Sequence, residues 1–522
     1  MDFKIIDIQP TQITIELDND TPYKPAAPVR LFLDGEGIGE FDVNVITVDG
    51  MVPDSLHSLR VTDTETGAES SVDFRTRYES VLLDIRSFGA AGDGVRNDTA
   101  AVQAAIYSCP ADGTVYVGKG TYLCDPLFLK SNIRIHLDEG AVIVGAVSRD
   151  EYPVLPGMTC TTDETGEYNL GTWEGNPLDC FASLITGINV ENISVYGRGC
   201  IDGNADKSDW WDNPKVRRGA WRPRLVYLCN CKNVTLSGIR AVNSPCWSIH
   251  PYYSDHISVI DVTIRNPDNS PNTDGIDPES CSHVNIVGAD ISVGDDCIAI
   301  KSGKYYMARK HYKQTSGVTV RNCVLNHGHG SVTIGSECAC GVRDVLVTKC
   351  IFDSTDRGLR IKSRRGRGSG SILDNIVFDN IYMKDVRMPF TVNMFYFCDP
   401  DGHSEYCQCK EPLPVDELTP EIRSIEAKNI RCTGVDVTLL TVYGLPERKV
   451  GLVSLENINA DFRPESERIP AVPVMMDGMD PMSGVGIYAR NVSELRMNNI
   501  IIHGITDKGP DVDGVDMITG IM

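Results

Sequence analysis

Three aspartates in the middle of the chain, Asp274, Asp295 and Asp296, have side chains suited to acid–base hydrolysis. Cleavage of a glycosidic bond needs one protonated carboxyl group for the leaving oxygen and one carboxylate that activates water or attacks directly. Carboxylates that lie close together cannot all ionise freely, because like charges raise the pKa of at least one of them. A cluster of these residues would therefore supply both an acid and a base.

After the aspartates come His329 and the segment Arg360-Ile361-Lys362, at intervals of roughly 20 to 35 residues. A chain that returns to one face at such intervals is typical of a right-handed parallel β-helix, whose coils stack about 4.8 Å apart. The motifs are then expected to converge on one patch. Within a strand, Arg360 and Lys362 would point to the same side and Ile361 into the core.

Gly294 precedes the adjacent pair Asp295 and Asp296. Neighbouring residues of a regular strand point to opposite faces, which would separate the two carboxylates. A bulge or bend at the glycine predicts that both face the same cleft.

Short strand-like runs recur through the chain and are separated by turns. One such repeat cannot bury its apolar face alone, so stacked copies are expected to share a continuous core. Examples are Asn192-Ile193-Ser194-Val195, Asn233-Val234-Thr235-Leu236, His256-Ile257-Ser258-Val259, His283-Val284-Asn285-Ile286, Gly317-Val318-Thr319-Val320, Asp344-Val345-Leu346-Val347 and Asn375-Ile376-Val377-Phe378.

Four motifs occur in order: Asn272-Thr273-Asp274, Gly294-Asp295-Asp296, Gly328-His329-Gly330 and Arg360-Ile361-Lys362. This series resembles the signature of glycoside hydrolase family 28, the polygalacturonase family, and the likeness extends over roughly residues 80 to 510. The resemblance implies an all-β fold, a right-handed parallel β-helix, and hydrolysis of α-1,4-galacturonosidic bonds with inversion.

If the chain works as this family does, Asp295 is the general acid, while Asp274 and Asp296 hold and activate the water. His329 would lie beside them and tune or orient the acid. Arg360 and Lys362 would hold a galacturonate carboxylate near the scissile bond, since a guanidinium fork and an ammonium suit that group. Further candidate substrate-binding residues are Asn272, His250, Tyr396 and Lys301.

The formal net charge of −23 argues against nucleic acid or an anionic membrane as a partner. An anionic polysaccharide would bind through a local cluster of cations in the motif region. That cluster comprises Lys301, Lys304, Arg309, Lys310, Arg357, Arg360, Lys362, Arg364, Arg365 and Arg367.

Residues 1 to 80 are predicted to form a separate small β-sandwich that resembles a fibronectin type III domain. Its expected strands lie at 4–8, 12–17, 29–33, 40–46, 58–62 and 71–76, with turn residues between them. A spacer or a cap over the first coil is favoured over carbohydrate binding of its own. Residues 81 to 522 are predicted to form the β-helix. It would begin with an amphipathic helix over 100–106, capped by Asp98 or Thr99, that covers the open end of the core.

Three long insertions, 154–179, 304–316 and 398–422, interrupt the repeats. Insertions of this length usually have a function, and on a solenoid they would stand at the rim of the cleft. They favour a cleft closed at one end and exo action from the non-reducing end. The open alternatives are endo action and a substituted substrate such as xylogalacturonan or rhamnogalacturonan.

Most of the 18 cysteines are interpreted as buried thiols, because Cys229, Cys231, Cys281, Cys297 and others fall within the repeats. No basic and apolar leader precedes the first strand, which predicts a reducing, cytoplasmic location; removal of a leader would instead mean a secreted or periplasmic protein. Cysteines and a histidine between 398 and 409 fit no common zinc template, so no metal or cofactor is predicted.

Two other classes of function stay open. A calcium-dependent lyase on a similar β-helix would use an acidic cluster, to which Asp277 and Glu279 would add. A non-catalytic carbohydrate-binding solenoid would bind oligogalacturonate without cleaving it. The sequence leaves the oligomeric state open.

Overall fold

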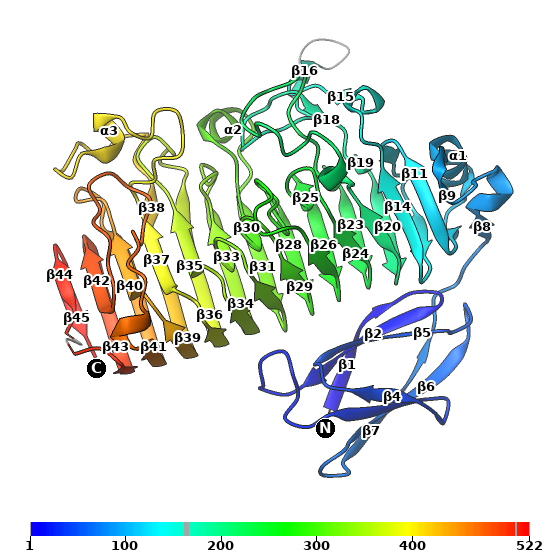
Figure 1. The fold of residues 1–522 in the computed structure, drawn as a ribbon, viewed down its shortest axis with the longest axis horizontal. Coiled ribbons are helices and arrows are strands. Elements are labelled where there is room, and N and C mark those ends of the chain that lie inside the picture. Colours follow the sequence, from blue (N-terminus) through cyan, green and yellow to red (C-terminus); the bar gives the residue numbers. More distant parts are fainter. Residues whose placement is uncertain (1, 161–165, 507–508, 521–522) are drawn as a thin grey trace.

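The computed structural model describes residues 2–160, 166–506 and 509–520 as an all-β chain, with a small sandwich followed by a long parallel β-helix (Figure 1). This confirms the predicted fold class. Among the described residues, no helix is long and apolar enough to span a membrane.

One long sheet of the β-helix holds 23 strands. Early coils contribute two short strands each, and from β34 on most coils contribute one long strand. The strands are β8 (Leu82–Asp84), β9 (Asp93–Asn97), β10 (Gly113–Val117), β11 (Gly120–Cys124), β13 (Ile133–Leu137), β14 (Ala141–Gly145), β20 (Glu191–Gly197), β21 (Cys200–Asp202), β23 (Lys232–Ser237), β24 (Arg240–Val242), β26 (Asp255–Ile260), β27 (Thr263–Arg265), β28 (Ser282–Val287), β29 (Asp290–Ser292), β31 (Thr315–Arg321), β32 (Val324–Asn326), β34 (Val342–Asp353), β36 (Ile372–Lys384), β38 (Glu421–Ile422), β39 (Ser424–Val435), β41 (Val450–Phe462), β43 (Val492–His503) and β45 (Met517–Thr519).

A second wall of the β-helix is formed by two parallel sheets of four and seven strands. Ile276 joins them, because it bridges Ile249 of the smaller sheet and Ile298 of the larger one. The strands are β12 (Leu127–Phe128), β19 (Ile185–Ile188), β22 (Val226–Cys229) and β25 (Ile249–Tyr252), then β30 (Ile298–Ile300), β33 (Val332–Ile334), β35 (Arg357–Lys362), β37 (Met388–Asn393), β40 (Thr438–Tyr443), β42 (Val485–Arg490) and β44 (Asp511–Asp513).

The repeated sequence pattern has a backbone cause. Asn192 and Asn233 adopt left-handed φ angles of 57° and 54°, which asparagine tolerates better than most residues. The side-chain amide of Asn233 donates to Asn192 at 2.9 Å, and that of Asn192 donates to Asn132 at 2.8 Å. The apolar residues that follow in each repeat are buried in one continuous core. These repeats therefore pair a turn residue of left-handed φ, in several coils an asparagine, with a layer of the core.

Helix α1 (Thr99–Ser108) covers the first coils and buries Val102, Ala105 and Ile106, as predicted. Asp98 stands at its N-cap position but makes no side-chain capping bond. Its carboxylate instead accepts hydrogen bonds from the backbone amides of Ala91 and Gly92, at 2.7 and 2.9 Å. The residue thus fastens the preceding loop to the helix start.

The N-terminal sandwich has seven strands in sheets of three and four. The single strand expected over 40–46 is wrong: two strands flank a break at Asp42-Val43-Asn44, and the Asn44 side chain instead hydrogen-bonds Asn322 of the β-helix at 3.1 Å. The strands are β1 (Asp2–Ile8), β2 (Gln12–Asp18), β3 (Val29–Leu33), β4 (Glu36–Phe41), β5 (Val45–Asp49), β6 (Leu56–Asp63) and β7 (Glu69–Arg75).

The sandwich lies against the side of the β-helix and does not cap its first coil, contrary to one of the expectations. Glu16 pairs with Arg321 at 2.8 Å, and Asp49 pairs with Arg198 at 2.9 Å. Both arginines lie at turns of the β-helix. Loops carrying β15 (Val154–Leu155), β18 (Cys180–Phe181), α2 (Tyr305–Lys310) and α3 (Glu405–Gln408) gather along the opposite edge (Figure 1).

Candidate active site

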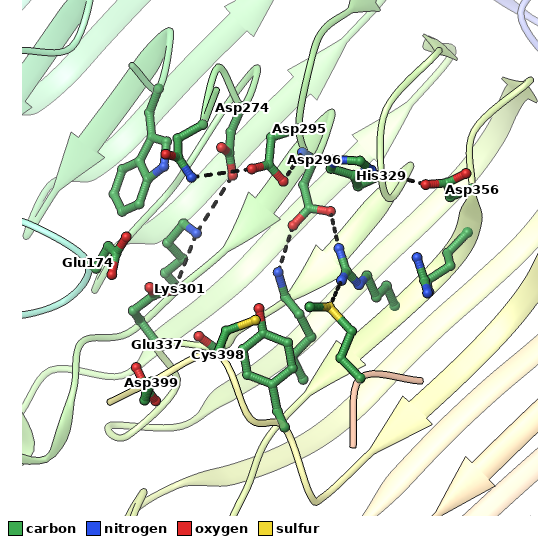
Figure 2. Close-up of a pocket in the computed structure, with 18 of the residues that line it drawn as sticks. Glu174, Asp274, Asp295, Asp296, Lys301, His329, Glu337, Asp356, Cys398 and Asp399 are labelled. Atoms are coloured by element: carbon green, nitrogen blue, oxygen red, sulfur yellow. Dashed lines mark hydrogen bonds and ion pairs between the residues drawn. The ribbon is translucent and has the colours of Figure 1, made fainter. Parts of the chain in front are cut away.

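A cleft of about 510 Å³ lies on the seven-stranded wall, at the edge where the long loops gather. It brings together nearly all the residues that the sequence singled out (Figure 2). Its lining residues are Trp173, Glu174, Lys215, Trp247, Asn272, Asp274, Asp295, Asp296, Lys301, His329, Ser336, Glu337, Asp356, Arg357, Arg360, Lys362, Tyr396, Cys398, Asp399 and Met475.

The three aspartates converge because the chain bends at Gly294. This residue lies in the turn between β29 and β30, and a Cβ built on it would stand 2.3 Å from the carbonyl oxygen of Ser270. Only glycine fits there without a shift of the backbone. Asp274, Asp295 and Asp296 thereby each place a carboxylate oxygen within 4.8 Å of the others. The predicted bend and the predicted cluster are both present.

Asp296 is held as a carboxylate by two cations of β35. Its two oxygens accept hydrogen bonds from Arg360 Nη1 at 3.0 Å and from Lys362 Nζ at 2.8 Å. Burial alone would raise the pKa of Asp296, but Lys362 and Arg360 override it and hold this pKa well below its usual range. Ile361 between them is buried in the core, so the predicted alternation along the strand is confirmed.

The pKa of Asp274 is shifted in the opposite direction from that of Asp296. Its side chain is buried, and its one ion-pair partner among the described residues is Lys301, at 3.8 Å. Burial, followed by the charge of Asp295, raises the pKa of Asp274 to about 8. The Asp274 carboxyl group therefore keeps its proton at neutral pH. The site thus holds a proton on one side and a fixed carboxylate, Asp296, on the other.

Lys301 lies in the cleft floor at the centre of a network of acids. Its ammonium group is 3.5 Å from Asp277 and 3.3 Å from Glu337, and it stands 4.3 Å above the ring centroid of Trp247. Its side chain is only 4% exposed. The predicted substrate-binding residue is therefore already shared among buried carboxylates, and its first effect is to neutralise them.

His329 is exposed at the cleft and is oriented by Asp356, whose carboxylate lies 3.0 Å from Nδ1. The hydrogen bond to Asp356 raises the pKa of His329 against the opposing effect of burial, and Asp295 and Asp296 raise it further. The backbone amide of His329 also donates to the carbonyl oxygen of Asp295 at 3.1 Å. The imidazole thus stands beside Asp295, as predicted, and these carboxylates favour the protonated form of His329.

Asn272 reaches Asp295 from the other side, with its amide nitrogen 3.4 Å from Oδ2. The residue adopts a left-handed φ of 55°, and its side-chain oxygen accepts a hydrogen bond from Arg222 at 2.7 Å. Arg222 also donates to the backbone oxygens of Pro245 and Pro271. This arginine positions Asn272, a role that the sequence did not indicate.

His250 lies beneath the cleft and does not line it, which contradicts its predicted contact with sugar. Its ring is fully buried, and Nε2 lies 3.1 Å from Glu279. Burial, reinforced by Arg224, keeps the pKa of His250 well below its usual range. By contrast, Tyr396 does line the cleft, with Lys362 5.6 Å from its ring centroid.

Most of the predicted basic cluster does not face the cleft. Arg365 forms an ion pair with Glu447 at 2.6 Å, and Arg367 pairs with Asp399 at the same distance. Arg364 pairs with both Asp399 and Asp401. These arginines fasten the third insertion and are not available to a ligand. Only Lys301, Arg357, Arg360 and Lys362 of the cluster line the cleft.

Several lining residues escaped the sequence reasoning, among them Trp173, Glu174, Lys215, Glu337 and Met475. The first two belong to the predicted first insertion. Lys215 and Met475 lie in two further loops, 203–225 and 463–484, that separate consecutive strands of the walls. The length of these two loops, and their lack of a strand-like sequence pattern, could have indicated that they reach the cleft. Nothing in their composition identified the individual lining residues.

The insertions are linked to one another at the rim. The backbone amide of Lys304 donates to the carbonyl oxygen of Gly175 at 2.9 Å, which joins the first two insertions. The ammonium group of Lys304 pairs with Asp399 at 2.8 Å, which joins the second to the third. Glu174 and Lys215 pair at the same end of the cleft, so this end is walled by connected loops.

Comparison with known proteins gives a match of residues 137–459 to the model of glycosyl hydrolases family 28. The chain belongs to this family. It is 30% identical over 311 residues to an "Endo-polygalacturonase" of Pectobacterium carotovorum subsp. carotovorum, covering 57% of this chain and 72% of that protein. It is 26% identical over 439 residues to an "Exo-poly-alpha-D-galacturonosidase" of Dickeya chrysanthemi, covering 76% of this chain and 69% of that protein.

Among solved structures, the fold is similar to that of a Yersinia enterocolitica family 28 exopolygalacturonase, with a TM-score of 0.73 and 19% identity over 99% of this chain and 98% of that one. The likeness extends over both parts of the chain. This family 28 protein is thus a glycoside hydrolase built as a β-helix with an N-terminal β-sandwich, as the motifs predicted.

Proposed function

We propose that this family 28 hydrolase removes galacturonate units from the non-reducing end of polygalacturonate or its oligomers, with inversion at the anomeric carbon. The observation that carries the proposal is the cleft itself. It combines a protonated aspartate, Asp274, and a fixed carboxylate, Asp296, with cations that suit a uronate, and connected loops wall one end. The printed names of the relatives, both exo and endo, support galacturonan as the substrate class.

The protonation pattern supports a division of labour among the aspartates. Asp295 is assigned as the general acid from the family resemblance, and it is the least buried of the three. Asp296 is the base that activates water, because its two cations keep it ionised. Asp274 holds the water as a neutral carboxyl group. The sequence analysis expected both Asp274 and Asp296 to hold and activate the water. In this proposal Asp274 holds the water and Asp296 activates it.

Inversion rests on the family resemblance and not on the spacing of the carboxylates. Inverting enzymes commonly keep their two carboxyl groups about 6.5–9.5 Å apart to leave room for water. Here one carboxylate oxygen of each of the three aspartates lies within 4.8 Å of one oxygen of the others. The water is therefore proposed to bind against Asp274 and Asp296 at one side of the cluster, and the anomeric outcome needs a direct measurement.

Exo action is supported by the wall of loops at the end of the cleft where Glu174 lies (Figure 2). In the described part of the chain, the Glu174 carboxylate lines the cleft on that side, beside the connected insertions. One terminal sugar would fit between the wall and the aspartates. The rest of the polymer would leave on the side of His329 and Asp356.

A time course of products from polygalacturonate, with a metal chelator present, tests this function. We expect monogalacturonate as the single small product from the earliest times, with viscosity falling slowly relative to the release of reducing ends. Mixed oligomers at early times would contradict the exo mode. Absence of any cleavage, with retained binding of oligogalacturonate, would mean a non-catalytic solenoid.

A calcium-dependent lyase has less support. Three carboxylates do lie close enough to hold a cation. However, Lys362 and Arg360 already pair with Asp296, and Lys301 pairs with Asp274. The other acids considered, Asp277 and Glu279, are fully buried. An unsaturated, ultraviolet-absorbing product that appears only with added calcium would reverse this conclusion.

A further inference from the structure

One cation of the cleft differs from the others in having no counter-ion. Arg360 and Lys362 pair with Asp296, Lys301 with three acids, and Lys215 with Glu174. Arg357 forms no ion pair with any carboxylate in the described part of the chain. Its guanidinium instead donates to the backbone oxygens of Pro473 at 3.1 Å and Val472 at 3.5 Å.

Arg357 is also buried, with 9% of its surface exposed. Burial, followed by the charge of Arg360, lowers the pKa of Arg357 to about 10, so it remains charged at neutral pH. A buried charge without a partner is costly, and an anion that enters the cleft removes that cost. The two backbone oxygens satisfy only part of the five-donor fork, which leaves donors for a ligand.

The position of Arg357 indicates which part of a substrate it meets. It follows Asp356, the partner of His329, and both line the cleft. Figure 2 shows Asp356 on the opposite side of the aspartates from Glu174. The closed end therefore holds the sugar to be released, and Arg357 lies on the side of the leaving group.

We propose that Arg357 is a binding subsite for the carboxylate of a galacturonate in the leaving group. This inference rests on the proposed function and adds a specificity determinant to it. The enzyme would distinguish a free uronate from a methyl ester or a neutral sugar on that side. A guanidinium with spare donors forms charge-assisted hydrogen bonds to a carboxylate, and an ester offers it only neutral acceptors.

The test compares two substrates that share the sugar to be released and differ in the leaving group. Trigalacturonate carries a carboxylate there, and an aryl α-galacturonide carries none. We expect Arg357→Gln to lower kcat/KM for trigalacturonate by about 10- to 100-fold, as for loss of a hydrogen bond to a charged group. The loss on the aryl substrate should be at least about tenfold smaller. Arg357→Lys should recover part of the trigalacturonate activity.

A matched control is Arg387→Gln. Arg387 donates to the backbone oxygen of Ile469 in the same loop that Arg357 holds, and it pairs with Asp436 outside the cleft. Loosening of the loop would affect both variants alike, whereas a subsite affects Arg357→Gln alone. An equal loss on both substrates, or no loss on trigalacturonate, would overturn the inference. A wild-type enzyme that cleaves neither substrate would instead refute the proposed function.

The same comparison can be made by binding if the aryl substrate turns over too slowly. Calorimetry can use the inactive Asp295→Asn protein with and without the Arg357→Gln substitution. The substitution should weaken the binding of trigalacturonate about 10- to 100-fold and the binding of monogalacturonate much less. Equal weakening of both ligands would place Arg357 outside the leaving-group side.

Discussion

Replacing Asp295 with asparagine is expected to lower kcat on trigalacturonate by about 10² to 10⁴, because the variant cannot donate a proton to the leaving oxygen. The change keeps the size of the side chain and its contact with Asn272, so KM should change far less. Initial rates of monogalacturonate release measure the effect. Asp268→Asn is the control, since Asp268 is exposed in the neighbouring turn and does not line the cleft.

The result also distinguishes the roles of Asp274 and Asp295. Burial and the charge of Asp295 place the raised pKa on Asp274, whereas the general acid role is assigned to Asp295. If Asp295→Asn keeps more than about a tenth of the wild-type rate while Asp274→Asn is inactive, the proton comes from Asp274 and the assignment of the two roles is reversed.

Replacing Lys301 with methionine is expected to reduce the free energy of unfolding by about 3–5 kcal/mol, the usual cost of leaving buried charges without their partner. Asp274, Asp277 and Glu337 would all lose the shared ammonium group. Chemical denaturation compares the variant with Lys384→Met, which removes an exposed ion pair to Asp353. That control should change the free energy of unfolding far less, because exposed ion pairs are screened by solvent.

The loss of free energy of unfolding in the Lys301→Met variant, its stability deficit, should depend on pH. In the folded protein the pKa values of Asp274 and Asp277 are raised by burial, and without Lys301 they rise further. Acids with raised folded pKa values cost no stability below their unfolded pKa of about 3.9, and the cost grows as pH rises above it. Glu337, whose pKa Lys301 helps to lower to about 2, contributes in the same direction. A deficit that does not shrink on acidification would contradict this account of the network.

Local rules predicted the parts of the site that depend on strands and turns. Alternation along β35 correctly placed Arg360 and Lys362 on one face and Ile361 in the core, and Gly294 correctly marked the bend that brings two adjacent aspartates together. These features follow from the period of a strand and from the space available to one residue. Both can be read from neighbouring positions in the sequence.

Contacts between distant segments could not be predicted in this way. Arg364, Arg365 and Arg367 looked like ligands for an anion, but their partners Asp399 and Glu447 lie in loops whose paths the sequence does not specify. His250 was misplaced for a similar reason, because the side on which it is buried depends on the packing of a strand covered on both faces. Loop residues such as Lys215 and Met475 reach the cleft only through tertiary structure.

The most direct test of the central claim is proton NMR of the first product released from trigalacturonate, recorded before mutarotation. The account predicts β-galacturonate as the initial anomer, formed together with digalacturonate and without an unsaturated signal. Release of the α anomer would mean retention through a covalent intermediate and would contradict the assignment of Asp296 as the residue that activates water.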